Sequence, residues 1–200
     1  MINDKWILTD CFDTLLLRTC SADCVKKKWS KKIERLLEFR INKNKIYDIR
    51  RSAERYLISF SKNGEFDGSD LFHEIYERLL IESSLQIDFK SENDFIEKMY
   101  EAELESEKES LILNSKHVEL MKNFRGSVAV VSDYNMGEKF LRRLFEYFKI
   151  SNLIDRVFVS CDYGENKYRG GLYQIVLDNL NITPSQAIMY GDSLHNDVEN

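Results

Sequence analysis

The hydrophobic pattern of the chain changes along its length. Residues 6–10 form a short apolar run that is typical of a buried strand. From about residue 21 to residue 110 the apolar positions recur with the period of a helix, and Val25 and Trp29 share one such face. After residue 125, short strand-like runs alternate with helical segments. The pattern therefore predicts a helical block between a first strand and an α/β segment.

The segment after residue 125 predicts a parallel sheet. Its expected elements are, in chain order, a strand over 127–132, a helix over 136–148, a strand over 156–160, a helix over 171–180 and a strand over 187–190. Strands that alternate with helices are typical of parallel strands joined by crossover helices. We therefore predict an α/β fold with a Rossmann-like parallel sheet, to which the N-terminal strand also belongs.

This assignment divides the chain into two domains. Residues 1–18 and 111–200 are expected to form the α/β core. Residues 19–110 are expected to form a separate all-α lobe, inserted between the first strand of the core and the rest.

Polar residues mark the expected helix starts and the outer surface of the lobe. Ser69 or Asp70 is expected to cap one helix, and Ser91 with Asp94 resembles a capping box before the next. The stretch "EAELESEKE" (101–109) places glutamates at every second position. We expect these glutamates to spread around a helix and to face solvent.

Composition and charge exclude several classes of protein. With 29 basic and 34 acidic residues the formal net charge is −5, which gives no basic excess for a nucleic-acid-binding protein. The sequence has no apolar run of about 18 residues that could span a membrane, and its N-terminus lacks a signal-peptide pattern. The 4 cysteines have neither zinc-ligand nor CxxC spacing. We expect a cytoplasmic protein with reduced thiols.

Polar residues follow each predicted strand. Asp10 follows the first strand, Ser132 and Asp133 end the second, Ser160 ends the third, and Asp192 follows the last. Asp10 by itself could simply be a turn residue that closes a strand. In open parallel sheets, however, ligands bind beyond the carboxyl ends of the strands. The convergence of polar residues at these ends favours a functional site.

The residue types at the strand ends are those that phosphoryl transfer needs. Asp10, Asp192 and Asp197 would supply the oxygen ligands that Mg²⁺ prefers. Ser132 can hydrogen-bond a phosphate oxygen, and Lys167 can offset negative charge. Carboxylate nucleophiles are known to form aspartyl-phosphate intermediates.

Four segments in chain order resemble the four motifs of the haloacid dehalogenase (HAD) superfamily. They are "DCFDTLL", "VAVVSD", "KYRGGLY" and "GDSLHND", and the helical lobe lies where that family inserts its cap. The resemblance implies that Asp10 is the nucleophile and that Ser132 and Lys167 hold the transferred phosphoryl group. Thr14 and Asp133 are also expected to contact the substrate, although Asp133 could instead cap the helix that follows it.

The resemblance also implies a set of Mg²⁺ ligands. Asp10 and Asp192 would bind the metal directly, together with the backbone carbonyl of Phe12. Asp197 would hold the water shell of the metal.

Phe12 departs from the family pattern. Phosphatases of the family usually carry a second aspartate at this position, which protonates the leaving group and later activates water. General acid–base help of this kind is worth roughly 10²–10⁴-fold. Three accounts remain open: Asp13 or a cap residue substitutes for the acid, the substrate has a good leaving group, or the domain binds phosphate but turns over slowly. Asp13 could also simply stabilise the turn.

The expected activity is that of a Mg²⁺-dependent phosphatase acting on a small phosphorylated metabolite through an aspartyl-phosphate intermediate. One alternative is a catalytically weak auxiliary domain that binds phosphate and metal. A hydrolytic dehalogenase is a further alternative, because a phenylalanine at position 12 also resembles that branch, but Asp192 and Asp197 retain the metal carboxylates that those enzymes lack.

The resemblance implies two further points about substrate and partners. The motifs look most like those of hydrolase domains associated with bacterial polysaccharide assembly, which implies a sugar phosphate as substrate. A core of this family normally continues with a helix and at least one strand beyond Asn200. We therefore expect the core to be truncated here and a fused or associated downstream domain to complete it.

Overall fold

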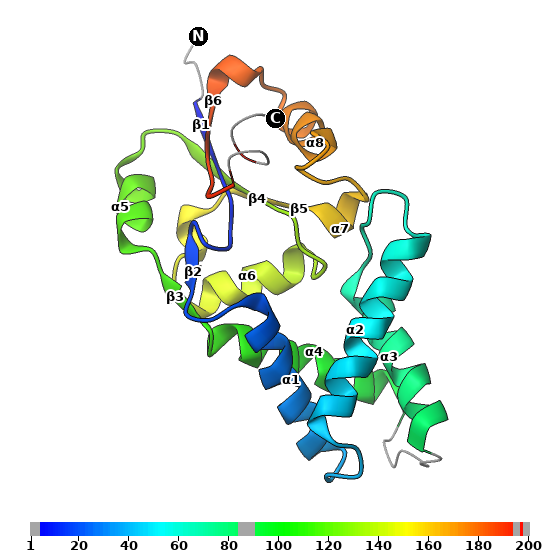
Figure 1. Cartoon of the computed structure of the whole chain (residues 1–200). Helices are drawn as coiled ribbons and strands as arrows, with labels where there is room; N and C mark the ends of the chain where they lie inside the picture. Colours follow the sequence, from blue (N-terminus) through cyan, green and yellow to red (C-terminus); the bar gives the residue numbers. More distant parts are fainter. Residues whose placement is uncertain (1–4, 84–90, 194–196, 198–200) are drawn as a thin grey trace. The chain divides into compact units, whose positions relative to one another are not determined.

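The computed structural model describes residues 5–83, 91–193 and 197 (Figure 1). The chain folds into two compact units. The first, called the α/β unit, comprises Met1–Arg18 and Leu111–Asn200, and the second, the helical unit, comprises Thr19–Ser110.

The α/β unit is built on a four-stranded parallel sheet with the order β5-β4-β1-β6. The strands are β1 (Trp6–Thr9), β4 (Ser127–Ser132), β5 (Arg156–Val159) and β6 (Ala187–Tyr190). Trp6 of β1 pairs with Ser127 on one side and with Ala187 on the other. The N-terminal strand is therefore an inner strand of the sheet, which confirms the predicted parallel α/β fold.

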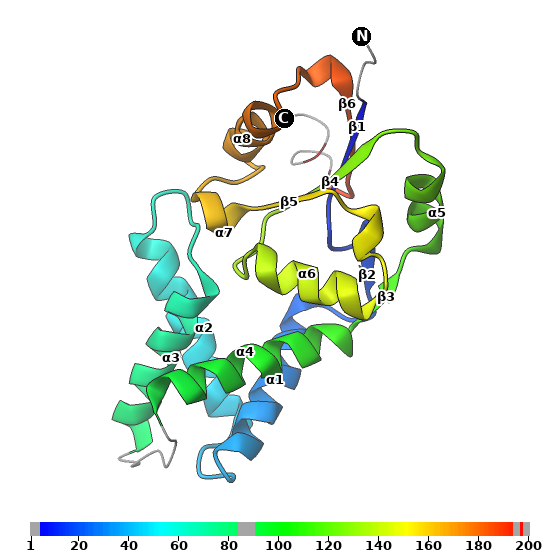
Figure 2. The ribbon, with the colours of Figure 1, turned by 180° about the vertical axis from the view of Figure 1, so that it is seen from behind.

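Helices cover both faces of this sheet. The helices are α5 (Ser115–Asn123), α6 (Glu138–Tyr147), α7 (Ser160–Tyr163) and α8 (Gly171–Leu180), with 3-10 turns at Ser151–Leu153 and Pro184–Gln186. In Figures 1 and 2, α6 and α8 lie on opposite faces of the sheet. Leu172 and Val176 of α8 pack against Leu8, Val131 and Phe158 in one buried cluster. Burial on both faces explains why β1, β4 and β5 read as mostly apolar runs.

Short elements account for most differences from the predicted boundaries. The third predicted strand ends at Val159, because Ser160 already begins α7. The pattern did not predict α5, nor the antiparallel pair of β2 (Leu16–Arg18) and β3 (Leu111–Leu113). A strand of three residues offers too few positions for an alternating pattern to be recognised.

The helical unit consists of α1 (Ala22–Leu36), α2 (Lys43–Phe60), α3 (Gly68–Ser83) and α4 (Glu92–Lys108) among the described residues. These four helices confirm the predicted helical period over the described residues of the segment. Trp29 of α1 is fully buried, and its indole N–H donates to the Met99 carbonyl at 3.0 Å. The same ring stacks on Phe72 with 6.1 Å between ring centroids. Trp29 therefore joins α1 to both α3 and α4.

The helix starts in this unit agree with the predictions in one case and differ in the other. The Ser91 hydroxyl accepts from the Asp94 amide at 3.2 Å, so Ser91 caps α4 as predicted. The prediction for α3 is wrong, because the Asp67 carboxylate accepts from the Ser69 amide at 2.6 Å. Asp67 is the capping residue, and Ser69 and Asp70 lie in the first turn of the helix.

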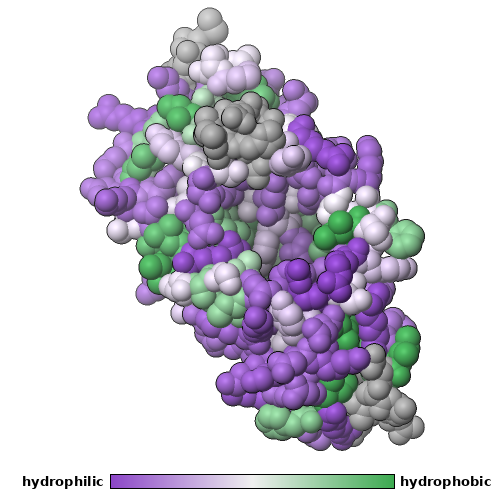
Figure 3. Space-filling view, in the orientation of Figure 1, coloured by the Kyte–Doolittle hydropathy of each residue, from purple (hydrophilic) through white to green (hydrophobic). Residues whose placement is uncertain are grey.

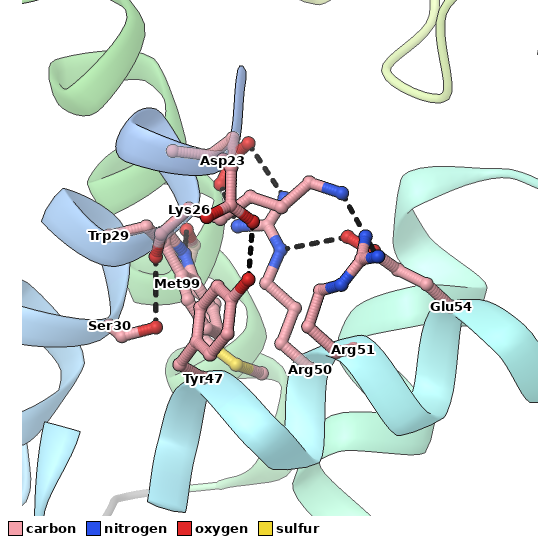
Figure 4. Close-up of polar contacts among 10 residues, drawn as sticks. Asp23, Lys26, Trp29, Ser30, Tyr47, Arg50, Arg51, Glu54 and Met99 are labelled. Atoms are coloured by element: carbon pink, nitrogen blue, oxygen red, sulfur yellow. Dashed lines mark hydrogen bonds and ion pairs between the residues drawn. The ribbon is translucent and has the colours of Figure 1, made fainter. Parts of the chain in front are cut away.

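The expectation of a solvated glutamate face on α4 is also wrong. Glu103 and Glu107 are each 3% exposed. Arg50 of α2 is 2% exposed and donates to both carboxylate oxygens of Glu103, at 2.5 and 2.9 Å. It also donates to Glu54 at 3.1 Å (Figure 4). Residues four apart on a helix share a face. Alternating glutamates therefore place one pair inward, where a buried guanidinium compensates the charge of Glu103.

The surface shown in Figure 3 is mostly hydrophilic. Within the part of the chain that the structure describes, no helix is long and apolar enough to cross a membrane.

Candidate active site

The carboxyl ends of β1, β4 and β6 bring together polar residues that are far apart in sequence. Asp10 follows β1 directly, and its amide donates to the carbonyl of Tyr190, the last residue of β6, at 2.8 Å. Ser132 is the last residue of β4 and is buried. The strand register therefore holds the Asp10 backbone beside the segment that carries Asp192.

Lys167 links two of the predicted carboxylates. Its Nζ atom lies 2.8 Å from Oδ1 of Asp10 and 2.6 Å from Oδ1 of Asp197. The Lys167 residue is 3% exposed. Burial disfavours the charged lysine, but the two carboxylates outweigh burial and raise the pKa of Lys167. Lys167 is therefore a fixed cation between Asp10 and Asp197.

Burial and the nearby Lys167 ammonium have opposite effects on the pKa of Asp10. Desolvation by burial raises the pKa of Asp10 to about 6, against the opposing effect of the Lys167 ammonium. A buried carboxylate whose negative charge is only partly compensated can accept further positive charge.

Three carboxylates form a cluster of oxygen donors. Oxygen atoms of Asp10, Asp192 and Asp197 all lie within 4.8 Å of one another. The cluster holds three acidic groups beside the Lys167 ammonium, and every donor in it is an oxygen. This donor set fits a hard divalent cation such as Mg²⁺, which prefers a few carboxylates and retains water.

Asp197 is fixed by contacts that the sequence did not predict. Its Oδ2 accepts from the Ser193 amide at 3.1 Å, and its own amide donates to the Ser193 carbonyl at 2.9 Å. The Tyr173 hydroxyl of α8 donates to Asp197 Oδ1 at 3.1 Å. The intervening residues 194–196 of this motif lie outside the described residues.

Asp133 anchors the segment that carries Lys167. Its Oδ1 accepts from the Lys167 backbone amide at 2.8 Å, and burial raises the pKa of this carboxyl. The alternative role as a helix cap is not what the structure shows, because Gly137 precedes the first turn of α6. Asp133 thus positions the lysine through its backbone.

Thr14 presents a buried hydroxyl near the nucleophile in sequence. The residue is 8% exposed, and its Oγ1 has no hydrogen-bond partner among the residues that the structure describes. The Thr14 carbonyl accepts from the Asn114 amide group at 2.8 Å. A buried polar group usually has a partner, so a ligand oxygen is a natural partner for this hydroxyl.

Phe12 lies between an aromatic ring and a cation. Its ring centroid is 4.7 Å from that of Tyr134 and 4.0 Å from the guanidinium carbon of Arg18. Arg18 also contacts Asp13, whose Oδ1 accepts from the Arg18 amide at 3.0 Å and whose Oδ2 lies 3.4 Å from the guanidinium. The sequence motif gives no signal for Arg18, which is the last residue of β2.

Asp13 occupies a left-handed backbone conformation, with φ at 59°. Glycine adopts this conformation without strain, and aspartate tolerates it better than most residues. The conformation therefore fits an aspartate that stabilises a turn.

His117 supports the backbone of the nucleophile from α5. Its Nε2 lies 2.8 Å from the Thr9 hydroxyl, which donates to the Asp10 carbonyl at 3.0 Å. Because the hydroxyl has a single hydrogen, it accepts from Nε2 of the imidazole. Burial lowers the pKa of His117 and so favours the neutral imidazole, with its proton on Nε2. No sequence spacing pointed to His117, because its helix was not predicted.

Comparison with known proteins gives a family and several structural neighbours. The family model described as "Haloacid dehalogenase-like hydrolase" matches residues 64–200. No curated protein matches the chain significantly.

The structural neighbours include dehalogenases and a phosphatase. The 2-haloacid dehalogenase from Pseudomonas syringae pv. tomato DC3000 is 15% identical, with 98% of this chain and 81% of that chain covered and a TM-score of 0.69. The putative HAD-hydrolase YfnB from Bacillus subtilis, whose structure contains bound magnesium, is 16% identical, with 98% and 83% covered and a TM-score of 0.56. A HAD phosphatase from Thermococcus onnurineus is 18% identical, with 98% and 80% covered and a TM-score of 0.57. At these identities the likeness shows the fold alone.

Proposed function

Because the chain belongs to the haloacid dehalogenase-like hydrolase family, we propose that it is a Mg²⁺-dependent phosphatase that forms an aspartyl-phosphate on Asp10. The observation that carries this proposal is the cluster in which Lys167 bridges Asp10 and Asp197. A third carboxylate, Asp192, has an oxygen within 4.8 Å of the other two. The family assignment makes the chain a hydrolase, and the carboxylate cluster favours a phosphoryl group over other substrates.

The carboxylate cluster would hold the metal. Asp10 and Asp192 are the proposed direct ligands with the Phe12 carbonyl, and Asp197 is the proposed holder of the metal's water shell. When bound, Mg²⁺ would neutralise charge on the phosphoryl oxygens. YfnB, a neighbour in fold, is bound to magnesium, which supports the choice of ion.

The other site residues have separate proposed roles. An Asp10 oxygen attacks phosphorus as the bond to the leaving group breaks, and the leaving oxygen retains the electron pair. Lys167 and Ser132 hold the phosphoryl oxygens, and the buried Thr14 hydroxyl donates to one of them. Asp133 keeps Lys167 in place through the Lys167 amide. Water then releases inorganic phosphate and restores Asp10.

The helical unit is the proposed cap, with residues 19–110 inserted into a core of 1–18 and 111–200. A cap excludes water and selects the substrate. We take sugar phosphates as the first small metabolites to test, on the strength of the sequence resemblance. We also propose a cytoplasmic location, on the strength of the cysteine spacing in the sequence.

A hydrolytic dehalogenase is the second candidate. It is favoured by Phe12 and by the likeness in fold to two haloacid dehalogenases. Asp192 argues for the phosphatase, because together with Asp10 it offers the carboxylate ligands that a Mg²⁺ site uses. The weak binding domain is the third candidate and also rests on Phe12.

Phosphate release from a panel of sugar, nucleotide and aryl phosphates tests the proposal. It is measured with Mg²⁺ and with chelator, and with Asp10→Asn as the control variant. The phosphatase predicts release that requires both Mg²⁺ and Asp10. Halide release from 2-haloacids in chelator would support the dehalogenase instead. No release of either kind by a folded protein that binds Mg²⁺ would support the binding domain.

A further inference from the structure

The leaving-group side of the proposed reaction is defined by Phe12. In the phosphatases that the sequence resembles, the residue two positions after the nucleophile supplies the proton for the leaving group. Here that side chain is an aromatic ring, which is 7% exposed and has no proton to give. The ring contacts Tyr134 on one part of its surface and the Arg18 guanidinium on another.

Asp13 is not placed to replace the missing acid. One of its oxygens accepts from the Arg18 amide at 3.0 Å, and the other faces the Arg18 guanidinium at 3.4 Å. Both carboxylate oxygens of Asp13 are therefore engaged by Arg18. Asp133, which directly follows β4, accepts from the Lys167 backbone amide and holds the segment that carries Lys167.

Arg18 therefore provides a positive charge beside the position where an acid would stand. The guanidinium carbon lies 4.0 Å from the Phe12 ring centroid, so the ring supports one face of the cation. Asp13 binds its edge and fixes its orientation. A guanidinium has five N–H donors in a rigid plane and matches a carboxylate or phosphate with paired hydrogen bonds. It stabilises an anion but transfers no proton.

We propose that the substrate is a phosphoric anhydride, either an acyl phosphate or a diphosphate, whose leaving group departs as an anion that Arg18 binds. This inference rests on the proposed phosphatase function. An alkoxide would need a proton at departure, which Phe12 cannot supply. A carboxylate or a phosphate leaves as a stable anion and needs only a cation.

Each step balances without an acid at position 12. An Asp10 oxygen forms a bond to phosphorus, the bond from phosphorus to the bridging oxygen breaks, and that oxygen keeps the electron pair. The carboxylate or phosphate leaves as an anion, and the Arg18 guanidinium binds it. Water then bonds to phosphorus, the bond to Asp10 breaks with its electron pair returning to the carboxylate, and both water protons remain on the released phosphate.

Substrate selectivity tests the inference. The full 200-residue chain is assayed with Mg²⁺ on acetyl phosphate, pyrophosphate and ADP, and on glucose 6-phosphate and glycerol phosphate as alkyl esters. The expected result is a kcat/KM for an anhydride at least about 10²-fold above that for either ester, which is the range that a missing acid commonly costs. The kcat/KM for acetyl phosphate, compared with those for pyrophosphate and ADP, shows whether an acyl phosphate or a diphosphate is preferred.

Variants distinguish the contribution of Phe12 from that of Arg18. Phe12→Asp restores an acid and is expected to raise kcat/KM for alkyl esters relative to that for anhydrides by roughly 10²-fold. Arg18→Gln is expected to lower kcat/KM for the anhydride by about 10- to 100-fold, and Arg18→Lys by less. Arg125→Gln, an exposed cation in the same unit, is the matched control and should change neither. The ratio of anhydride to ester activity distinguishes a direct role of Arg18 from a loss of folding.

The two levels of proposal fail in different ways. Comparable rates on esters and anhydrides, or an unchanged ratio in Arg18→Gln, would overturn the inference and leave the phosphatase standing. No phosphate release from either class would overturn the proposed function and the inference together.

Discussion

The Nζ atom of Lys167 lies 2.8 Å from Oδ1 of Asp10, which joins the first strand end of the α/β unit to a segment near its last helix. The same ammonium reaches Asp197 at 2.6 Å, so one buried cation serves two buried carboxylates. Burial of such charges is costly unless each is paired. The helical unit contains a corresponding pairing, in which the buried Arg50 serves Glu54 and Glu103.

Replacing Lys167 by methionine should lower phosphatase activity by at least about 10²-fold, because the phosphoryl oxygens lose a fixed cation. It should also destabilise the metal-free protein by about 3 kcal/mol, because Asp10 and Asp197 remain buried without it. Phosphate release and urea unfolding without Mg²⁺ measure the two effects. Lys116→Met, an exposed lysine on α5, is the control. Equal unfolding midpoints for the two variants would contradict the structural role of Lys167.

Tyr173→Phe should weaken Mg²⁺ binding by about 10-fold without unfolding the protein. The Tyr173 hydroxyl donates to Asp197 at 3.1 Å, and such partners of proposed metal-holding groups commonly contribute 10- to 100-fold in affinity. Titration of Mg²⁺ followed by calorimetry measures the change directly. Tyr168→Phe is the control, because Tyr168 is 61% exposed. An unchanged affinity in Tyr173→Phe would show that this hydrogen bond does not support the site.

Arg50→Met should destabilise the helical unit by about 3–5 kcal/mol, because Glu54 and Glu103 lose their shared buried cation (Figure 4). Arg55→Met on the same helix removes an exposed arginine and should change stability by less than about 0.5 kcal/mol. Urea unfolding monitored by circular dichroism compares the two. A loss in Arg50→Met no larger than in Arg55→Met would refute the importance of the cluster.

The stability of the helical unit should fall in acid through Glu54. Burial alone would raise the pKa of this carboxyl, but Arg50 and Lys26 outweigh burial and lower the pKa below its ordinary value of 4.5. A group with a lowered folded pKa contributes stability above its unfolded pKa and loses it as the pH falls through the folded value. The free energy of unfolding should therefore decrease below about pH 4.5. Glu54→Gln should be less stable at pH 7 and should show a flatter acid limb. A parallel pH dependence in both proteins would contradict the assignment to Glu54.

Much of the fold was predictable because burial leaves a direct pattern. The strand Ser127–Ser132 is apolar at nearly every position, since both faces of a parallel sheet are covered. The helix Gly171–Leu180 has the predicted bounds, marked by glycine at its start and Asn181 in a left-handed conformation at its end. The pair β2 and β3 was missed because its stability comes from a partner far along the chain.

The site was predictable only where its residues belong to the four motifs. Asp10, Lys167, Asp192 and Asp197 were named from those motifs, and the structure brings them together. The contacts of Arg18, Tyr173 and His117 depend on tertiary packing, so the spacing of residues in the sequence does not predict them. Glu103 shows the reverse error, since a charged residue was assigned to solvent although a buried arginine was available in another helix.

The position of β1 in the sheet has a consequence for the order of folding during synthesis. Trp6 pairs with Ser127 and Ala187, so the first strand leaves the ribosome long before either neighbour exists. The four helices of Thr19–Ser110 depend on contacts within one continuous segment, which is complete earlier. Domains generally fold as units as the chain emerges, so we expect the helical unit to form first. β1 then stays without its two neighbouring strands until they have been translated. The carboxylate cluster can form only after the segment that carries Asp192 and Asp197 has been synthesised.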